Sequence, residues 1–99
     1  MTITKKQNGS ELLVELSGRL DTITAPEFNK FLTENLSGIK TLIIDLGKVD
    51  YVSSAGLRVL LLAHKTMAEE GQLIIRHVIK DVMDIFTMTG FNEIFTIED

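Results

Sequence analysis

The sequence predicts a single α/β domain, a mixed β-sheet with helices packed on it in the order ββαβαβαβ. The chain has 99 residues, 44% of them hydrophobic, and one proline, so it has enough apolar material for one core. Short apolar runs typical of strands alternate with longer stretches of helical periodicity. Single glycines stand where these elements are expected to end. We therefore expect one domain over residues 1–99.

The first two strands are expected at residues 3–7 and 12–16, joined by a hairpin around Asn8-Gly9. Asn-Gly tolerates the positive φ angles that a tight hairpin requires. Apolar residues alternate along the second strand, so at least one of its faces is expected to be buried. A loop is expected over residues 18–23.

The segment Thr24-Ala25-Pro26-Glu27 predicts the start of the first helix, and Gly38 predicts its end. The Thr24 side chain can cap free backbone amides while the Glu27 side chain reaches back to the Thr24 amide. Proline is tolerated in a first helical turn. One apolar stripe follows at three- and four-residue spacing: Phe28, Phe31, Leu32 and Leu36.

Residues 41–46 form a nearly continuous apolar run, which is expected of a central strand covered on both faces. After a turn at residues 47–52, a long helical pattern runs over residues 54–70 and stops at Gly71. Several apolar residues lie off its inner stripe: Val59, Leu62, Ala63 and Met67. They indicate cover by a neighbouring helix of the same domain, which we favour, or by a partner.

The remaining chain predicts a strand at residues 73–75, a helix at residues 81–89 that Gly90 ends, and a closing strand at residues 94–97. Right-handed crossovers are expected to connect the parallel strands through the helices.

Composition excludes several classes of function. The net charge of −4 has the wrong sign for electrostatic binding to nucleic acid or anionic membranes. Without cysteine there is no disulfide, thiolate metal site or cysteine nucleophile, and His64 and His77 lack metal-ligand spacing. We expect no metal and no cofactor. The longest apolar run, residues 59–63, is too short for a membrane span, so we expect a cytoplasmic protein without membrane insertion.

No enzymatic activity is expected. A hydrolase nucleophile elbow has glycine two positions before and after its serine, but Val52 stands two residues before Ser54. The glycines are scattered singly, so no phosphate-binding loop is predicted. Asp21 and Asp50 are candidates for a carboxylate pair, although acidic residues in loops are usually solvated or capping.

The segment Ser53-Ser54-Ala55-Gly56 opens the long helix, where free amides and a partial positive charge stabilise an anion. Two interpretations are open. One of the serines simply caps the helix, as serine often does. Alternatively, one serine is phosphorylated and gains about −1.5 to −2 charge, which the helix end accommodates but a partner's interface repels.

Several motifs together resemble the STAS domain of bacterial anti-sigma factor antagonists, over essentially the whole chain and in the family's order. They are Gly18-Arg19-Leu20-Asp21, the segment of residues 24–27, residues 42–46, residues 49–57, and Thr89-Gly90-Phe91 with Phe95. The resemblance implies a mixed sheet with helices packed mainly on one side.

The resemblance also implies a phosphorylation switch. The unphosphorylated antagonist binds an anti-sigma factor, itself a serine kinase, and releases the sigma factor. Phosphorylation breaks this complex, and a serine phosphatase restores it. Ser54 is the phosphoacceptor implied here. The family often has aspartate directly before that serine, whereas this chain has Ser53, which is the alternative acceptor.

The partner-binding surface implied by the resemblance lies where segments that follow strand ends converge at one sheet edge. Tyr51 and Leu57 are expected to anchor the partner, and Arg58 to pair with it, because aromatic and arginine side chains tend to dominate interfaces. The full set is Asp21, Thr22, Ile23, Thr24, Tyr51, Ser53, Ser54, Ala55, Gly56, Leu57 and Arg58.

Two other functions compete with this one. A STAS subunit without a phosphorylation switch, which docks on the ATPase of a membrane lipid-transport complex, would use the same surface. A stand-alone small-molecule sensor is disfavoured because so short a chain leaves little volume for a pocket. We expect a monomer that does not bind nucleic acid directly.

Overall fold

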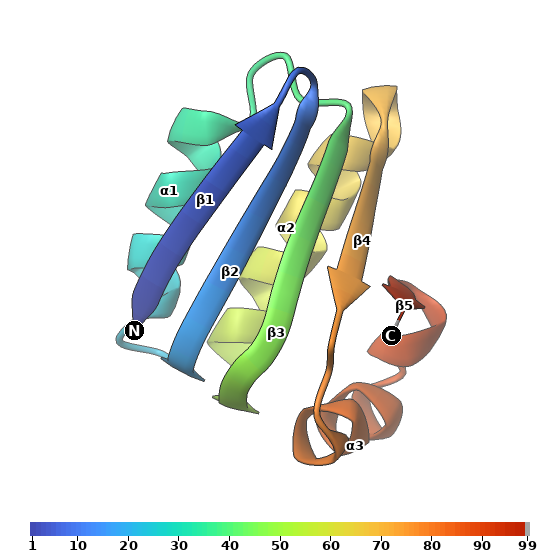
Figure 1. Ribbon diagram of the computed structural model, residues 1–99. Helices are drawn as coiled ribbons and strands as arrows, with labels where there is room; N and C mark the ends of the chain where they lie inside the picture. Colours follow the sequence, from blue (N-terminus) through green and yellow to red (C-terminus); the bar gives the residue numbers. More distant parts are fainter. Residues whose placement is uncertain (99) are drawn as a thin grey trace.

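The computed structural model describes residues 1–98 and shows one five-stranded mixed sheet (Figure 1). Asp99, the last residue of the expected domain, lies outside the described residues. The spatial order of strands follows the chain, and only the first pair is antiparallel. The strands are β1 (Thr2–Asn8), β2 (Glu11–Leu20), β3 (Thr41–Val52), β4 (Gln72–Arg76) and β5 (Thr96–Glu98).

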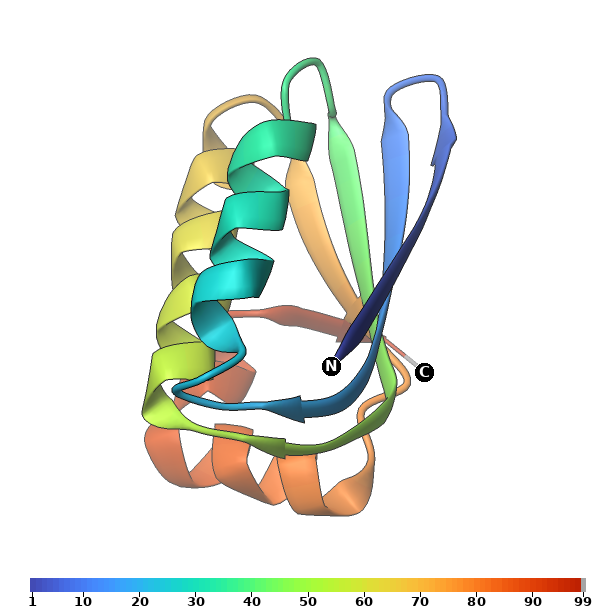
Figure 2. The same cartoon turned by 90° about the vertical axis from the view of Figure 1, so that its left-hand side faces the viewer.

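The helices cover one face of this sheet. Helices α1 (Ala25–Asn35) and α2 (Ser54–Glu70) lie side by side against it, and α3 (Lys80–Thr89) crosses one end (Figures 1 and 2). A short 3-10 helix, η1 (Phe91–Glu93), follows α3. The expected fold class, the order ββαβαβαβ and the one-sided packing of helices are therefore confirmed.

A single apolar core lies between the sheet and the helices. Alternate residues of the strands face inward, and the largest fully buried side chains include Phe28, Leu42, Ile44, Leu60 and Phe86. The flank of α2 is covered within the domain: Val59, Ala63 and Met67 are buried beside α1, as we favoured. Leu62 stays 43% exposed.

The opposite face of the sheet has no helix within residues 1–98 (Figure 2). The central strand was expected to be covered on both faces, and this is only partly so. Ile43 points to the open face yet is only 6% exposed, with Leu13 and Ile74 as its neighbours across the strands. Its cover therefore comes from cross-strand side chains and not from a second layer.

Strands β2 and β3 are longer than the sequence predicts. Their C-terminal parts pair irregularly and lack the alternating pattern by which a regular strand is recognised. The loop expected at residues 18–23 starts only after Leu20, and the turn expected at residues 47–52 belongs to β3. Two register shifts, between Glu15 and Ser17 and between Gly18 and Arg19, break the alternation on which strand prediction relies. Both strands bend there toward the helical layer (Figure 2).

Other boundaries differ by one to three residues. The hairpin turn consists of Gly9 and Ser10, with φ +64° at Gly9, while Asn8 still pairs with Glu11. Helix α1 ends at Asn35, three residues before Gly38, and the closing strand runs over Thr96–Glu98 instead of residues 94–97. Gly90 does end α3, in the left-handed region expected of a helix stop.

None of the helices formed by residues 1–98 combines the length and apolarity that crossing a membrane requires.

We predict that Gly71→Ala lowers the free energy of unfolding by about 3 kcal/mol. A Cβ at Gly71 would overlap the Lys40 carbonyl, which also accepts a hydrogen bond from the Gln72 amide (2.9 Å). Denaturant unfolding of Gly38→Ala is the control. Gly38 has φ +78° but open space around its Cα, so this variant should lose only about 1 kcal/mol. Equal losses in the two variants would contradict the steric reason.

Candidate functional site

The loop after β2 and the first turn of α2 meet at one edge of the sheet, because β2 and β3 are parallel neighbours. Arg19 pairs with Tyr51 in the register, and Leu20 pairs with Val52. The Ser53 amide donates a hydrogen bond to the Leu20 carbonyl oxygen at 2.9 Å. The structure thus brings together the segments that were expected to form the partner surface.

Gly56 sets how closely these segments approach. A Cβ at this position would lie 2.7 Å from the Leu20 carbonyl oxygen and 2.8 Å from Leu20 Cγ. A side chain would therefore push the first turn of α2 away from the end of β2.

Gly56 and Leu57 are both buried, Leu57 with only 6% exposed. Leu57 belongs to the core beneath the surface, so its side chain is not available as the expected anchor.

Ser53 and Ser54 occupy different environments. Ser53 is the N-cap of α2, with an extended backbone, and its Oγ accepts a hydrogen bond from the Gly56 amide at 3.3 Å. Ser54 is the first residue of the helix and is exposed. Its hydroxyl makes no hydrogen bond to any other residue of the range 1–98. The two interpretations from the sequence therefore fall on different residues: Ser53 caps, and Ser54 presents a free hydroxyl.

Asp21 organises the loop between β2 and α1. Its Oδ1 accepts hydrogen bonds from the amides of Ile23 and Thr24, each at 3.0 Å. The hydrogen bond from the Thr24 amide holds the pKa of the Asp21 carboxyl below its ordinary value of 3.8. The Thr24 hydroxyl accepts from the Asp21 amide (2.9 Å) and donates to the Arg19 carbonyl (2.7 Å).

The capping box expected at Thr24 and Glu27 is therefore wrong. The Thr24 side chain is turned back toward β2 and makes no cap on α1. Its amide, which Glu27 was expected to reach, is already bound by Asp21. The Asp21 carboxylate thus binds one of the two amides that a capping box uses, and the Thr24 hydroxyl is engaged with Arg19 instead of the helix. No hydrogen bond in the described part of the chain links Asp21 with Asp50, the two acidic residues suggested as a carboxylate pair.

Arg19 links the loop to β3 and was missed by sequence reasoning. Its guanidinium carbon lies 4.4 Å from the centroid of the Tyr51 ring, and its Nε lies 3.6 Å from Asp21 Oδ2. Tyr51 is held in this way while 38% of it stays exposed. Only the irregular register of β2 and β3 places Arg19 beside Tyr51, and no spacing in the sequence reveals that register.

The rest of the expected surface is exposed, apart from the half-buried Ala55, and is partly apolar. Ile23, at the tip of the loop, is 86% exposed. Arg58 is exposed and lines a groove of about 370 Å³ between the N-terminal halves of α1 and α2. The groove is lined by Thr22, Ala25, Pro26, Asn29, Ala55, Arg58, Val59 and Leu62.

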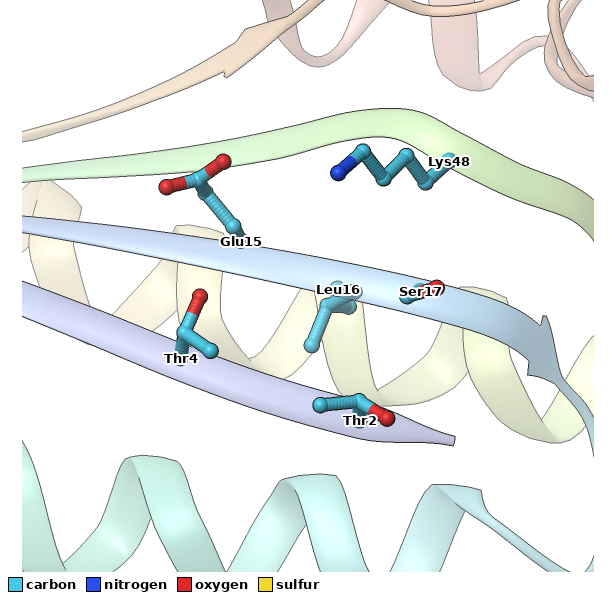
Figure 3. A pocket seen from close by; sticks show the side chains of 6 residues that line it. All are labelled: Thr2, Thr4, Glu15, Leu16, Ser17 and Lys48. Atoms are coloured by element: carbon cyan, nitrogen blue, oxygen red, sulfur yellow. The ribbon is translucent and has the colours of Figure 1, made fainter.

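The open face of the sheet carries a separate hollow of about 210 Å³ (Figure 3). Residues of β1, β2 and β3 line it: Thr2, Thr4, Glu15, Leu16, Ser17 and Lys48. Glu15 and Lys48 are not within ion-pair distance of each other, and none of the expected site residues reaches this hollow. It is therefore not part of the candidate site.

Both histidines have structural partners. His77 Nδ1 lies 2.8 Å from Asp45 Oδ2, and the ring of His64 meets Phe95 edge-on with centroids 6.0 Å apart. Within residues 1–98, no three or more His, Cys, Asp or Glu side chains gather in a way that could hold a metal ion.

Comparisons with known proteins identify the family and the fold. A family model described as the STAS domain matches residues 2–99. The protein BtrV of Bordetella bronchiseptica, whose name places it among anti-sigma factor antagonists, is 31% identical over 98% of this chain and 85% of its own length. The structure of an anti-sigma factor antagonist from Mycobacterium paratuberculosis superimposes with a TM-score of 0.87 at 22% identity, covering 97% of this chain and 83% of that one.

SpoIIAA, a Bacillus cell fate determinant and anti-sigma factor antagonist, shares the fold in two forms. The unphosphorylated form has a TM-score of 0.77 and covers 99% of this chain and 88% of its own. The phosphorylated form has a TM-score of 0.75, with coverage of 99% and 92%. Both are 14% identical to this chain, so they show a common fold.

The two serines should differ in stability tests. We predict that Ser53→Ala lowers the free energy of unfolding by about 1 kcal/mol, because it removes the cap on the Gly56 amide. Ser54→Ala should change it by less than about 0.5 kcal/mol, since the hydroxyl is exposed and unbound. Urea unfolding of the two variants beside the wild type measures the difference. A larger loss for Ser54→Ala would reverse the assignment of the cap.

Proposed function

The chain belongs to the STAS domain family of anti-sigma factor antagonists, and from this premise we propose that phosphorylation of Ser54 switches its binding to an anti-sigma factor. Proteins of this kind are non-enzymatic regulators. The unphosphorylated chain binds an anti-sigma factor that is also a serine kinase, and the sigma factor is released. Phosphorylation dissociates the complex, and a serine phosphatase restores the binding form.

The free hydroxyl of Ser54 is the observation that carries this proposal. A kinase must reach the acceptor oxygen, and Ser54 is exposed at the first position of α2, while the Ser53 oxygen is engaged in the cap. The kinase would transfer the γ-phosphoryl group of ATP to Ser54 Oγ, with ADP and the hydroxyl proton as leaving species. Further support comes from SpoIIAA, which has this fold and occurs in a phosphorylated form.

The position of Ser54 explains how one modification can act as a switch. A phosphoryl group adds about −1.5 to −2 charge at the N-terminus of α2, where the free amides and the helix dipole favour a negative charge. The fold should therefore survive. The same charge in a closed interface must be desolvated or repelled by the partner. A penalty of about 3 kcal/mol weakens binding roughly a hundredfold.

The proposed partner surface consists of the loop, the end of β3 and the first turn of α2 on the single domain of residues 1–99. Ile23 and Tyr51 supply exposed apolar contact area, and Arg58 supplies a positive charge for an acidic group of the partner. Gly56 and Leu57 support this surface from below. Its other members are Asp21, Thr22, Thr24, Ser53, Ser54 and Ala55. We propose that the chain acts as a monomer, with the anti-sigma kinase and the phosphatase as its partners.

Intact-mass analysis tests the modification directly. We predict that protein purified from its native cells with phosphatases inhibited carries an addition of about 80 Da, the mass of one phosphoryl group. The addition should persist in Ser53→Ala and disappear in Ser54→Ala. Loss only in Ser53→Ala would move the site by one residue. No addition under any growth condition would refute the switch and favour the docking subunit that contacts a transporter ATPase.

The surface is tested by affinity for the anti-sigma kinase recovered with the native protein. We predict that Tyr51→Ala weakens binding at least about tenfold, because it removes the ring that Arg19 holds in place. Glu69→Ala is the matched control, since Glu69 is exposed near the opposite end of α2 and its variant should bind normally. The surface is wrong if Tyr51→Ala and Arg58→Ala both leave the dissociation constant, measured calorimetrically, unchanged.

A further inference from the structure

We propose that Arg58 pairs within the same chain with the phosphoryl group on Ser54. The inference rests on the proposed function, in which Ser54 is modified. In this arrangement the modification withdraws a positive charge from the partner surface at the same time as it adds a negative one.

The two residues are neighbours on α2. Ser54 is its first residue and Arg58 follows four positions later, so both lie on one face of the helix with Cβ atoms roughly 5–6 Å apart. Side chains in a helix lean toward its N-terminus. A side chain as long as that of Arg58 can therefore reach the turn that begins with Ser54. Both residues are exposed, so no packing has to break for them to meet.

No competing charge in the described residues holds Arg58 elsewhere. No carboxylate within residues 1–98 lies within 4.0 Å of its guanidinium, and the first turn of α2 has no acidic residue. Arg19, the other arginine near this edge, is already engaged with Tyr51 and Asp21. Arg58 is thus free to take a new anion, while Arg19 would have to give up existing contacts.

The chemistry of the pair fits this role. A guanidinium presents parallel N–H donors that match two oxygens of a phosphoryl group, and charge-assisted bonds of this type are stronger than neutral ones. Before modification, the same donors are available to an acidic group of the anti-sigma kinase. Phosphorylation then replaces a contact between chains with one inside the chain. The partner loses a favourable charge pair, and its interface would have to accommodate the dianionic phosphoryl group on Ser54.

The test is a ³¹P NMR titration of chains with phosphoserine genetically encoded at position 54. Ionisation of a phosphoserine has its second midpoint near pH ~6. A nearby cation favours the dianion, so Arg58 should lower this midpoint. We expect Arg58→Gln to raise it by about 0.3 pH unit relative to wild type, the shift that corresponds to one helical ion pair. Arg58→Lys should restore most of the difference because it restores the charge.

Lys65→Gln is the matched control. It removes one positive charge from an exposed position on the same helix, eleven residues from Ser54 and therefore roughly 16 Å along the axis. That distance exceeds the screening length of about 8 Å at physiological salt, so its midpoint should equal that of the wild type. Circular dichroism of each variant shows whether the helix content of the chain is intact.

Equal midpoints in wild type and Arg58→Gln would overturn the proposal. An equal rise in Arg58→Gln and Lys65→Gln would also overturn it, since that result reflects only the general charge of the helix. The outcome is independent of whether a kinase modifies Ser54 in cells, because the phosphoserine is installed during synthesis. Failure here and failure of the proposed function are therefore distinguished by the titration and the mass measurement.

Discussion

The close approach of α2 to the end of β2 is the constraint on which the candidate site depends. Leu20 accepts a hydrogen bond from the Ser53 amide, and its carbonyl leaves no room for a side chain at Gly56. These contacts fix the first turn of α2 against the strand that leads into the Asp21 loop. Segments separated by about thirty residues of chain thereby become one continuous surface. The conformation of the loop is further stabilised by Asp21, whose carboxylate binds two of its amides.

The order of elements was predictable because helical and strand periodicities are strong in this chain. The continuation of β2 and β3 was not, because a strand is recognised by alternation and the register shifts break it. Along β3 the buried residues Leu46, Val49 and Val52 recur every third position, which does not resemble a strand. The Arg19–Tyr51 contact could not be predicted for the same reason, since it requires the pairing of two irregular strands.

Local hydrogen-bonding motifs were harder to predict than the strands, because the same residue can fit two different motifs. Thr24 and Glu27 have the spacing of a capping box, yet the Asp21 carboxylate takes the amide that the box needs. Ser53 and Ser54 are the opposite case, in which two residues fit the same motif. Both residues suit a helix start in sequence, and only the backbone decides that Ser53 is the cap. Serine and aspartate are both good caps, and with serine at position 53 the helix is capped without a negative charge beside Ser54.

The two borders of the sheet determine how readily another chain can add a strand to it. Strand β1 has one free border and carries adjacent lysines, Lys5 and Lys6, in its middle. Strand β5, at the other border, has only three residues. Charged and very short border strands are poor templates for another chain to add a strand. Both borders of the sheet therefore disfavour the addition of a strand from another chain, which lowers the tendency to aggregate through the sheet.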